Sequence, residues 1–266
     1  MNLKRIAGLL CVLAAGLASA GPAWAVEYVA LGDSYSSGTG TRSYYEPSCQ
    51  RSAYAYPYLL HSAHPDWTFV NATCAGARTG DLVNTQAGAL TADTDWVTYT
   101  IGGNDAGFSS VITECALPSW ASDCNGAIAA AESFVATVLP GRLDLVNGTI
   151  KARAPRAQVI ALDYPRLFDG TDCNAPTFFS PSEMTRLNRA ADLLAAQVRA
   201  AATRAGSNFA FRDVIPAFAG HAVCDGGSGS PAEWINGLSI PVGESYHPKA
   251  TGHANGYLPA VRGVTG

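Results

Sequence analysis

The sequence predicts an α/β fold, a three-layer α/β/α sandwich whose central sheet is mainly parallel. Short apolar segments that end at turn residues alternate along the chain with longer segments of helical periodicity. This alternation is typical of a parallel sheet covered by helices on both faces. Without its first 25 residues the chain has 241 residues and shows no internal repeat or long linker. We therefore expect a single domain over residues 26–266.

Five segments are expected to form the strands of this sheet. Residues 27–31 form a short apolar run that ends at Gly32, and Gly102–Gly103 ends the third segment. Runs of this length and composition are typical of buried strands. The other four segments are residues 67–70, 95–101, 157–162 and 208–211.

The helical segments lie between these strands. Residues 127–150 are rich in Ala and Leu at helical spacing. Ser180, Pro181 and Glu183 predict a second helix start, with Ser180 as N-cap, Pro at the first position and Glu at the third. Gly206 is expected to end that helix. Its apolar residues share one face: Leu187, Ala191, Leu194 and Val198.

The first 25 residues predict a secretory signal peptide. Lys4 and Arg5 precede an apolar run over 6–18, which is too short to cross a bilayer, and Ala23-Trp24-Ala25 matches a cleavage pattern. We expect cleavage after Ala25 and a secreted, extracellular protein. Residues 18–20 offer a second cleavage site, and a buried helix or an uncleaved anchor is the alternative.

The charge of the chain argues against a nucleic-acid partner. The sequence has 17 Lys and Arg against 21 Asp and Glu, and removal of Lys4 and Arg5 leaves 15 basic residues and a formal charge of −6. Phosphate binding needs a clustered basic surface. No later segment is long and apolar enough to span a membrane, so we expect no stable membrane anchor. We also expect a monomer.

Cysteine usage supports export. Cys11 would leave with the signal peptide, and an even number of cysteines in an exported chain predicts disulfides. The chain has no C-x-x-C motif, so no structural zinc site is expected. Six cysteines allow 15 pairings, and the sequence alone does not choose among them. The six are Cys49, Cys74, Cys115, Cys124, Cys173 and Cys224.

Three polar, glycine-bearing loops follow the first three strands. Ligands of open α/β sheets bind outside the carboxyl ends of the strands, so these loops should meet at one edge. The first carries Ser34, a candidate nucleophile that would need a base to take its proton. The alternative is an ordinary Asp-Ser helix cap. The chain has no G-x-S-x-G motif, the usual signature of a nucleophile elbow.

His247 is the candidate base. Pro248 restricts it to an extended conformation, which suits a projecting side chain, although a solvated loop histidine is the alternative. The remaining histidines have no comparable context: His61, His64, His221 and His253. His61 and His64 could form a metal-binding pair, but we expect them at the surface instead.

The loops also offer donors for an oxyanion hole. Asn104 could donate its side-chain amide, and Gly76 and Ser34 could donate backbone N–H groups. Losing one such donor typically costs about 2.7–4 kcal/mol of barrier. The alternative for the segment Gly102–Asp105 is a turn that leads into a helix.

Together the four motifs resemble those of the GDSL, or SGNH, hydrolase superfamily. They are Gly32-Asp33-Ser34, Gly76, Gly102–Asp105 and His247, in the order of that family and over nearly the whole mature chain. The chain is most similar to secreted actinobacterial lipases, esterases and phospholipases A1. This resemblance implies a flavodoxin-like sheet and sequential disulfides, which is also the pairing we favour: Cys49–Cys74, Cys115–Cys124 and Cys173–Cys224.

Two positions depart from the family pattern. Tyr35 replaces the Leu of the family name. Glu244 stands three residues before His247, where the wider family often has Asp, so a Ser-His-Glu triad is one alternative. In the branch that this chain resembles there is often no acid, and a backbone carbonyl two residues before the His orients the ring. We favour this dyad of Ser34 and His247, with the Ser245 carbonyl as the orienting group.

The motifs predict two-step acyl transfer on a carboxylic ester, without a metal or organic cofactor. The resemblance implies a lipid ester as substrate. Alternatives are a carbohydrate deacetylase and, outside enzymes, a secreted binding module on a hydrolase scaffold. Aromatic side chains in expected loops could line an acyl site or belong to the core: Tyr35, Phe108, Trp120, Phe178, Phe179 and Trp234.

Overall fold

A computed structural model describes residues 25–266, so the predicted signal peptide lies outside the described residues except for Ala25. Five parallel strands form one sheet in the order β2-β1-β3-β4-β5. Each predicted strand is confirmed to within one residue at either end. The strands are β1 (Glu27–Gly32), β2 (Thr68–Asn71), β3 (Trp96–Thr100), β4 (Gln158–Leu162) and β5 (Phe209–Arg212).

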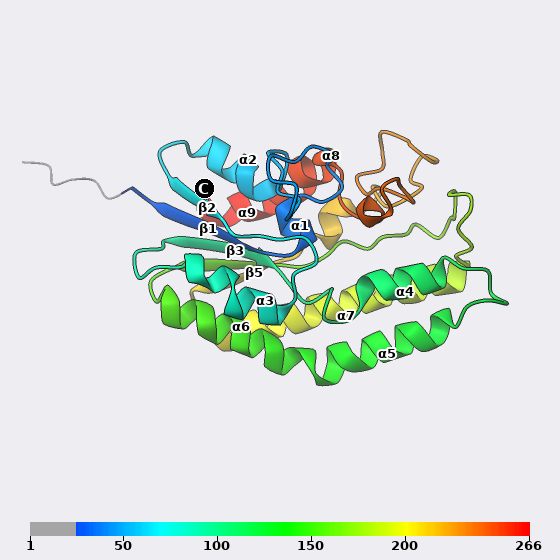
Figure 1. Cartoon of the computed structure of the whole chain (residues 1–266), viewed down its shortest axis with the longest axis horizontal. Coiled ribbons are helices and arrows are strands. Elements are labelled where there is room, and N and C mark those ends of the chain that lie inside the picture. The colour runs from blue at the N-terminus through cyan, green and yellow to red at the C-terminus, as the bar shows by residue number, and fades with distance from the viewer. Residues whose placement is uncertain (1–24) are drawn as a thin grey trace, which may run out of the picture.

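Helices cover both faces of the sheet, which confirms the three-layer architecture (Figure 1). On one face lie α2 (Tyr56–Ala63), α8 (Ala250–Gly252) and α9 (Leu258–Thr265). The opposite face carries α3 (Thr79–Asn84), α4 (Phe108–Cys115), α5 (Cys124–Thr137), α6 (Leu139–Arg153) and α7 (Pro181–Ala205). The short helix α1 (Ser34–Ser37) directly follows β1. No helix among residues 25–266 is long and apolar enough to cross a membrane.

The helix α7 begins as its sequence predicts. Ser180 is its N-cap, and Ser180 and Glu183 form a reciprocal capping box in front of Pro181. The segment 127–150, in contrast, is not one helix. It divides into α5 and α6 at Val138, since Pro140 has no N–H to donate and its ring disfavours a continuous helix.

The strand order places the predicted site. β1 lies between β2 and β3, so the loops after these three strands are neighbours at the carboxyl edge. Gly32 ends β1 with a φ of +118°, and a side chain there would clash with the Thr100 carbonyl oxygen of β3. A glycine at this position allows the close approach that brings Ser34 beside β3.

Three disulfides join the cysteines of the described chain in sequential pairs: Cys49–Cys74, Cys115–Cys124 and Cys173–Cys224. The first connects two loops near the carboxyl edge, and the second spans the connection between α4 and α5. The third connects the segment before α7 to the segment before the His247 loop. All three therefore fix loops rather than strands.

Candidate active site

Ser34 is the first residue of α1. Asp33 caps this helix, and its carboxylate accepts the Tyr35 N–H at 3.0 Å. The cap and the preceding strand fix the direction of the Ser34 side chain, which is 7% exposed. The alternative weighed from sequence was an Asp-Ser cap without chemistry. The structure contains the cap and also places a base beside the serine.

His247 contacts Ser34 across 213 residues of sequence. Its Nε2 lies 2.8 Å from Ser34 Oγ, and its Nδ1 lies 2.9 Å from the Ser245 carbonyl oxygen. Because a carbonyl can only accept, Nδ1 donates to it and Nε2 is left to accept the Ser34 proton. Burial lowers the pKa of His247 to about 4, although the Ser245 carbonyl acts in the opposite direction. The ring is therefore a neutral base at ordinary pH.

The polar partners of Glu244 are other residues than this histidine. Its carboxylate accepts the Tyr44 hydroxyl at 2.7 Å and lies 3.4 Å from Arg42 Nε. Among the described residues, no hydrogen bond joins it to His247. Its position fits a role in holding the surrounding loop.

Backbone pairing holds the His247 loop in place. The Asn236 N–H donates to the His247 carbonyl at 2.9 Å, and the Tyr246 N–H donates to the Asn236 carbonyl at 2.9 Å. The Asn236 side-chain amide donates to the carbonyls of His247 and Gly40. The loop is thereby fixed to Asn236, 11 residues earlier, and through that side chain to the distant Gly40.

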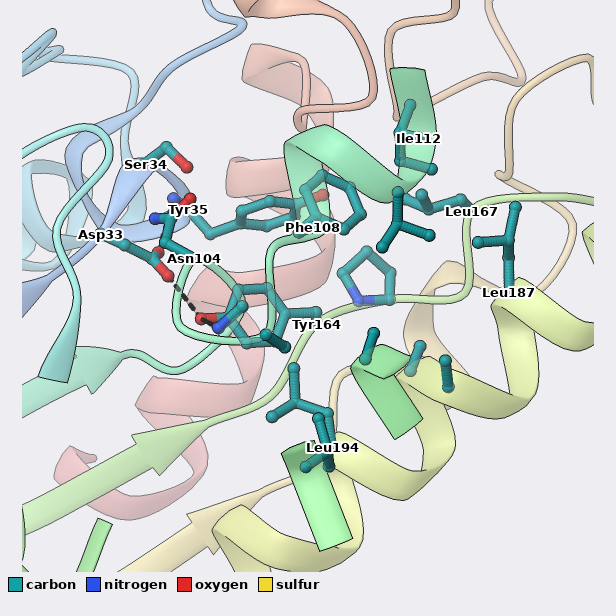
Figure 2. A pocket seen from close by; sticks show the side chains of 18 residues that line it. Asp33, Ser34, Tyr35, Asn104, Phe108, Ile112, Tyr164, Leu167, Leu187 and Leu194 are labelled. Carbon is teal, nitrogen blue, oxygen red and sulfur yellow. Dashed lines mark hydrogen bonds between the residues drawn. The ribbon is translucent and has the colours of Figure 1, made fainter. Parts of the chain in front are cut away.

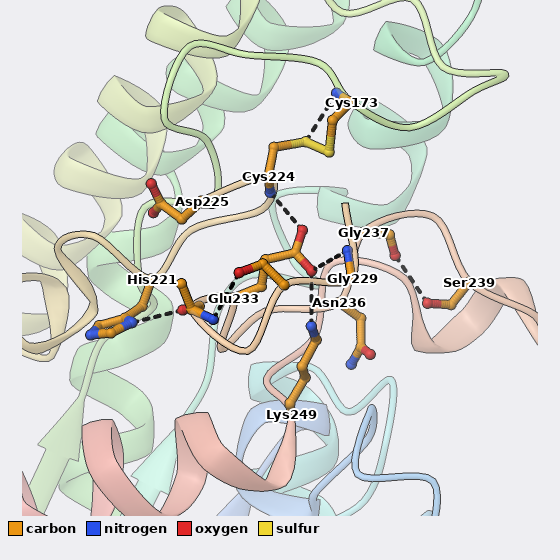
Figure 3. Close-up of polar contacts among 12 residues, drawn as sticks. Cys173, His221, Cys224, Asp225, Gly229, Glu233, Asn236, Gly237, Ser239 and Lys249 are labelled. Atoms are coloured by element: carbon orange, nitrogen blue, oxygen red, sulfur yellow. Dashed lines mark hydrogen bonds and ion pairs between the residues drawn. A yellow bond between two sulfur atoms is a disulfide. The ribbon is translucent and has the colours of Figure 1, made fainter. Parts of the chain in front are cut away.

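A buried carboxylate, Glu233, adds a second anchor for this loop (Figure 3). It forms an ion pair with Lys249 at 3.0 Å and accepts the N–H groups of Cys224 and Gly229 at 2.8 and 3.0 Å. Because Cys224 is bonded to Cys173, the disulfide, Glu233 and the residues after His247 form one connected unit.

The predicted oxyanion donors lie in the neighbouring loops. Gly76 has a φ of +79°, a conformation that favours glycine. Within the described part of the chain, the backbone N–H groups of Gly76 and Ser34 donate no hydrogen bond to another residue. The Asn104 amide donates to the Ala77 carbonyl at 3.0 Å, and an amide nitrogen carries a second hydrogen.

Asp105 connects the same two loops. Its carboxylate accepts the Thr79 N–H at 2.8 Å and the Thr79 hydroxyl at 2.6 Å. Arg142 of α6 also donates to it at 2.9 Å. The sequence motif around Asn104 thus contains one residue that can contact substrate and another that holds the loops together.

The sequence analysis considered Asp33 only as a helix cap and motif residue, and it gave no role to Tyr164. The buried Asp33 carboxylate accepts the Thr100 hydroxyl at 2.7 Å and the Tyr164 hydroxyl, and burial raises its pKa to about 6. The Tyr164 oxygen in turn accepts the Gly103 N–H at 3.2 Å. Tyr164 follows β4. Because ligands of open α/β sheets bind at the carboxyl ends of the strands, its position in the sequence was a signal for a place near the site.

An apolar pocket extends from Ser34 between α4, α5 and α7. Figure 2 shows Ser34 and Asn104 at one end, with Ile112, Leu167 and Leu187 toward the other. Its lining is almost wholly apolar, and three of the residues expected on the apolar face of α7 contribute to it: Leu187, Ala191 and Leu194. A pocket of this kind can hold an acyl chain beside the serine.

The structure decides which of the six aromatic candidates line this pocket. Tyr35 and Phe108 line the pocket. The other four do not: Trp120 and Phe178 are exposed, Phe179 packs on Tyr246, and Trp234 stacks on His221. The lining comes instead from aliphatic residues of the helices.

The described residues offer little to a metal ion. Atoms of Cys173, Cys224 and Glu233 lie within 4.8 Å of one another, but the two sulfur atoms are bonded to each other and are not thiolates. His61 and His64 stack on Phe69 and Trp67 respectively.

Comparison with known proteins gives the family. The model of the GDSL-like lipase/acylhydrolase family matches residues 30–254, a span that includes Ser34, Gly76, Asn104 and His247. The chain belongs to this family. It is accordingly an enzyme that hydrolyses carboxylic esters, and the binding-module alternative is not supported.

Named relatives of this GDSL-family chain are Streptomyces proteins. Lipase 1 of Streptomyces coelicolor is 44% identical, over 99% of this chain and all of the relative. The crystal structure of an extracellular lipase from Streptomyces rimosus is 42% identical with a TM-score of 0.82, over 90% of this chain and 99% of that one. A phospholipase A1 from Streptomyces albidoflavus is 40% identical with a TM-score of 0.83, at the same coverage.

Proposed function

We propose that this protein is a secreted lipase that hydrolyses lipid esters through a Ser34–His247 dyad. The observation that carries the proposal is the continuous line of contacts from the Ser245 carbonyl through His247 to Ser34 Oγ. The pocket beside Ser34 supports an acyl chain rather than an acetyl group, because its lining is apolar over several helical turns. The likeness to a phospholipase A1 adds phospholipids to the proposed substrates.

The proposed reaction begins with proton transfer. His247 Nε2 takes the Ser34 proton as Oγ attacks the ester carbonyl carbon, and the carbonyl oxygen becomes an oxyanion. The N–H groups of Ser34 and Gly76 and the second hydrogen of the Asn104 amide would stabilise that charge. His247 then protonates the leaving alcohol, which departs and leaves an acyl group on Ser34.

The second half repeats these steps with water. His247 takes a proton from water, the hydroxyl attacks the acyl carbon, and the C–O bond to Ser34 breaks. Ser34 recovers its proton from His247, and the carboxylic acid is released. Since a carbonyl rather than a carboxylate orients the ring, Ser245 contributes only its backbone to this scheme.

Secretion is a separate part of the proposal. We propose a signal peptide over residues 1–25, supported by its charge and apolar pattern and by three disulfides in the described chain. Sequencing the N-terminus of protein from the culture medium would locate the cut. An intact Met1 on secreted protein would contradict it.

Replacement of the nucleophile tests the proposed reaction. Ser34→Ala should fold normally and lose about a millionfold in kcat on a soluble ester, because both steps need the serine oxygen. An active-site phosphonate should label the parent at Ser34 and leave the variant unlabelled. Retained turnover or labelling elsewhere would reject the assignment.

A substrate panel tests the lipid assignment separately. Esters of increasing chain length, a phosphatidylcholine and an acetylated xylan would be compared by kcat/KM. We expect the longer acyl chains and the phospholipid to be hydrolysed, since the pocket offers apolar surface to each added methylene. Preference for the xylan over all long-chain esters would favour carbohydrate deacetylation instead.

A further inference from the structure

Large apolar side chains are exposed in three loops at the carboxyl edge of the sheet. The loops are residues 116–123, 170–180 and 237–244, and in Figure 1 they lie at the end of the molecule toward which the strands point. Trp120 is 87% exposed and Ile240 is 91% exposed. We call the following set the apolar rim: Leu117, Trp120, Phe178, Leu238, Ile240 and Val242.

The third of these loops is fixed directly to the candidate active site. The Ser239 N–H donates to Ser245 Oγ at 2.9 Å, and the Ser245 N–H donates to the Val242 carbonyl at 3.0 Å. Ser245 is the residue whose carbonyl faces His247. Ile240 is therefore held in a short turn beside the catalytic histidine.

The second loop is fixed to the same region. Phe179 packs against Tyr246, the residue before His247, with ring centroids 5.8 Å apart. Phe178, its neighbour, is 54% exposed. One side of this loop is therefore packed beside the histidine, while an adjacent aromatic side chain faces water.

The first loop follows the wall of the acyl pocket. It begins at the end of α4, whose Val111 and Ile112 line the pocket, and the Cys115–Cys124 disulfide closes it. Arg186 of α7 donates to the Asn125 carbonyl at 2.9 Å. This bond joins the start of α5, just after the loop, to α7, which also forms a wall of the pocket. Trp120 thus stands on a disulfide-closed loop that directly follows a helix of the pocket wall.

Charge distinguishes which surface the rim could meet. The three loops contain no Lys or Arg. Their carboxylates are used internally: Asp123 accepts Gly126 N–H, Asp172 accepts Phe179 N–H, and Glu244 accepts the Tyr44 hydroxyl. Arg42, close to the third loop, faces Glu244. Arg42 also donates to Ser239 of the third loop at 3.1 Å and is 58% exposed, but its charge is paired with Glu244. The loops thus offer no cluster of basic groups to an anionic lipid, whereas exposed Trp and aliphatic side chains fit the boundary of a neutral one.

We propose that the apolar rim binds the surface of neutral or zwitterionic lipid and presents the Ser34 pocket to it. Exposed apolar patches of this kind mark interaction sites, and continuity with the pocket favours lipid as the partner. This inference rests on the proposed lipase function. It adds where the enzyme meets its substrate and which lipid charge it accepts.

Binding is tested without hydrolysis, so that failure of this inference is separate from failure of the proposed reaction. Ser34→Ala is mixed with phosphatidylcholine vesicles, and the bound fraction is measured by co-sedimentation. We expect binding that is unchanged by added salt, since no charge pairing is involved. Trp120→Ser and Ile240→Ser in the Ser34→Ala background should each weaken vesicle binding about tenfold. This is the effect expected when one large side chain that enters the lipid is removed.

The matched control is Leu145→Ser, which removes an exposed aliphatic side chain of α6, 61% exposed, outside the three loops. It should leave vesicle binding unchanged. Equal loss in the control, unaltered binding in the rim variants, or binding only to anionic vesicles would overturn the proposal. So would rim-dependent dimers in size-exclusion chromatography, because they would assign the surface to a second copy.

Activity gives an independent readout. With Ser34 restored, Trp120→Ser/Ile240→Ser should hydrolyse a soluble short-chain ester at the parent rate and lose activity on vesicle-borne ester. Loss on both substrates in equal measure would mean that the rim supports the active site itself and would contradict a lipid-docking role.

Discussion

The two sides of Ser34 are built differently. Toward Asp33 and His247, polar groups are held by hydrogen bonds that connect the carboxyl ends of β1, β3 and β4 and join Ser34 to the His247 loop. Toward α4, α5 and α7, the walls are aliphatic and make few directional contacts. Proton transfer requires fixed geometry, whereas an acyl chain requires only shape and apolar surface. The two sides should therefore respond separately to substitution.

Among substitutions that leave Ser34 and His247 in place, filling the apolar side should have the largest effect. Ala191→Phe places a ring in the pocket and should exclude about three methylenes of a long acyl chain, at about 0.8 kcal/mol each. We expect kcat/KM on a long-chain ester to fall roughly fiftyfold and that on an acetate ester to change little.

Ala196→Phe is the control for this change, because Ala196 lies on an exposed part of the same helix. It should leave the chain-length profile as it is. If Ala191→Phe weakened acetate and long-chain hydrolysis equally, the pocket would not be the acyl site.

A smaller effect is expected on the polar side. Tyr164→Phe removes the hydroxyl that donates to Asp33 and accepts the Gly103 N–H. We expect kcat to fall about tenfold with little change in KM, because the loop that carries Asn104 loses its alignment.

Tyr99→Phe separates alignment from stability. The Tyr99 hydroxyl is also buried and donates to Asn147 at 2.6 Å, on the α6 side of the sheet. Both variants should lower the Tm, but only Tyr164→Phe should lower kcat. If Tyr99→Phe and Tyr164→Phe had the same kcat, Tyr164 would have no specific role in positioning the active-site loop.

The pH dependence should show a still smaller change near neutrality. Burial lowers the pKa of His247 to about 4, so kcat/KM should hold from pH 7.5 to 6, whereas a histidine of ordinary pKa 6.5 would lose about three quarters. The unfolded chain takes up this proton below about 6.5 and the native one does not, so this group lowers stability as pH falls. Burial also raises the pKa of Asp33 to about 6, so Asp33→Asn removes the other group close to Ser34 whose titration falls in this range. A fall in kcat/KM centred at pH 6.5 in both the parent and this variant would contradict the lowered pKa of His247.

The sequence predicted the strands accurately because their apolar runs are short, and Gly32 and Gly102 mark the ends of two of them. It also predicted three of the polar loops that meet at the carboxyl edge. It did not predict the break at Val138, where apolar periodicity continues through Pro140. The aromatic residues stayed open between acyl site and core for a related reason, because an apolar side chain shows the same sequence pattern whether it packs in the core or lines a pocket.

The network around Asp33 was missed for a different reason. Asp33 accepts hydrogen bonds from Thr100 and Tyr164, which are 67 and 131 residues away in sequence. Neither partner belongs to a motif. Such contacts appear only when the strand order is known, because that order decides which loops are neighbours.

The most direct test concerns what orients His247. Glu244→Gln keeps the size of the side chain and a partner for Tyr44 but removes the charge. If the Ser245 carbonyl holds the ring, kcat/KM on a soluble ester should stay within about threefold of the parent. A loss of several orders of magnitude in a normally folded variant would mean that Glu244 completes a triad, and the dyad account would be wrong.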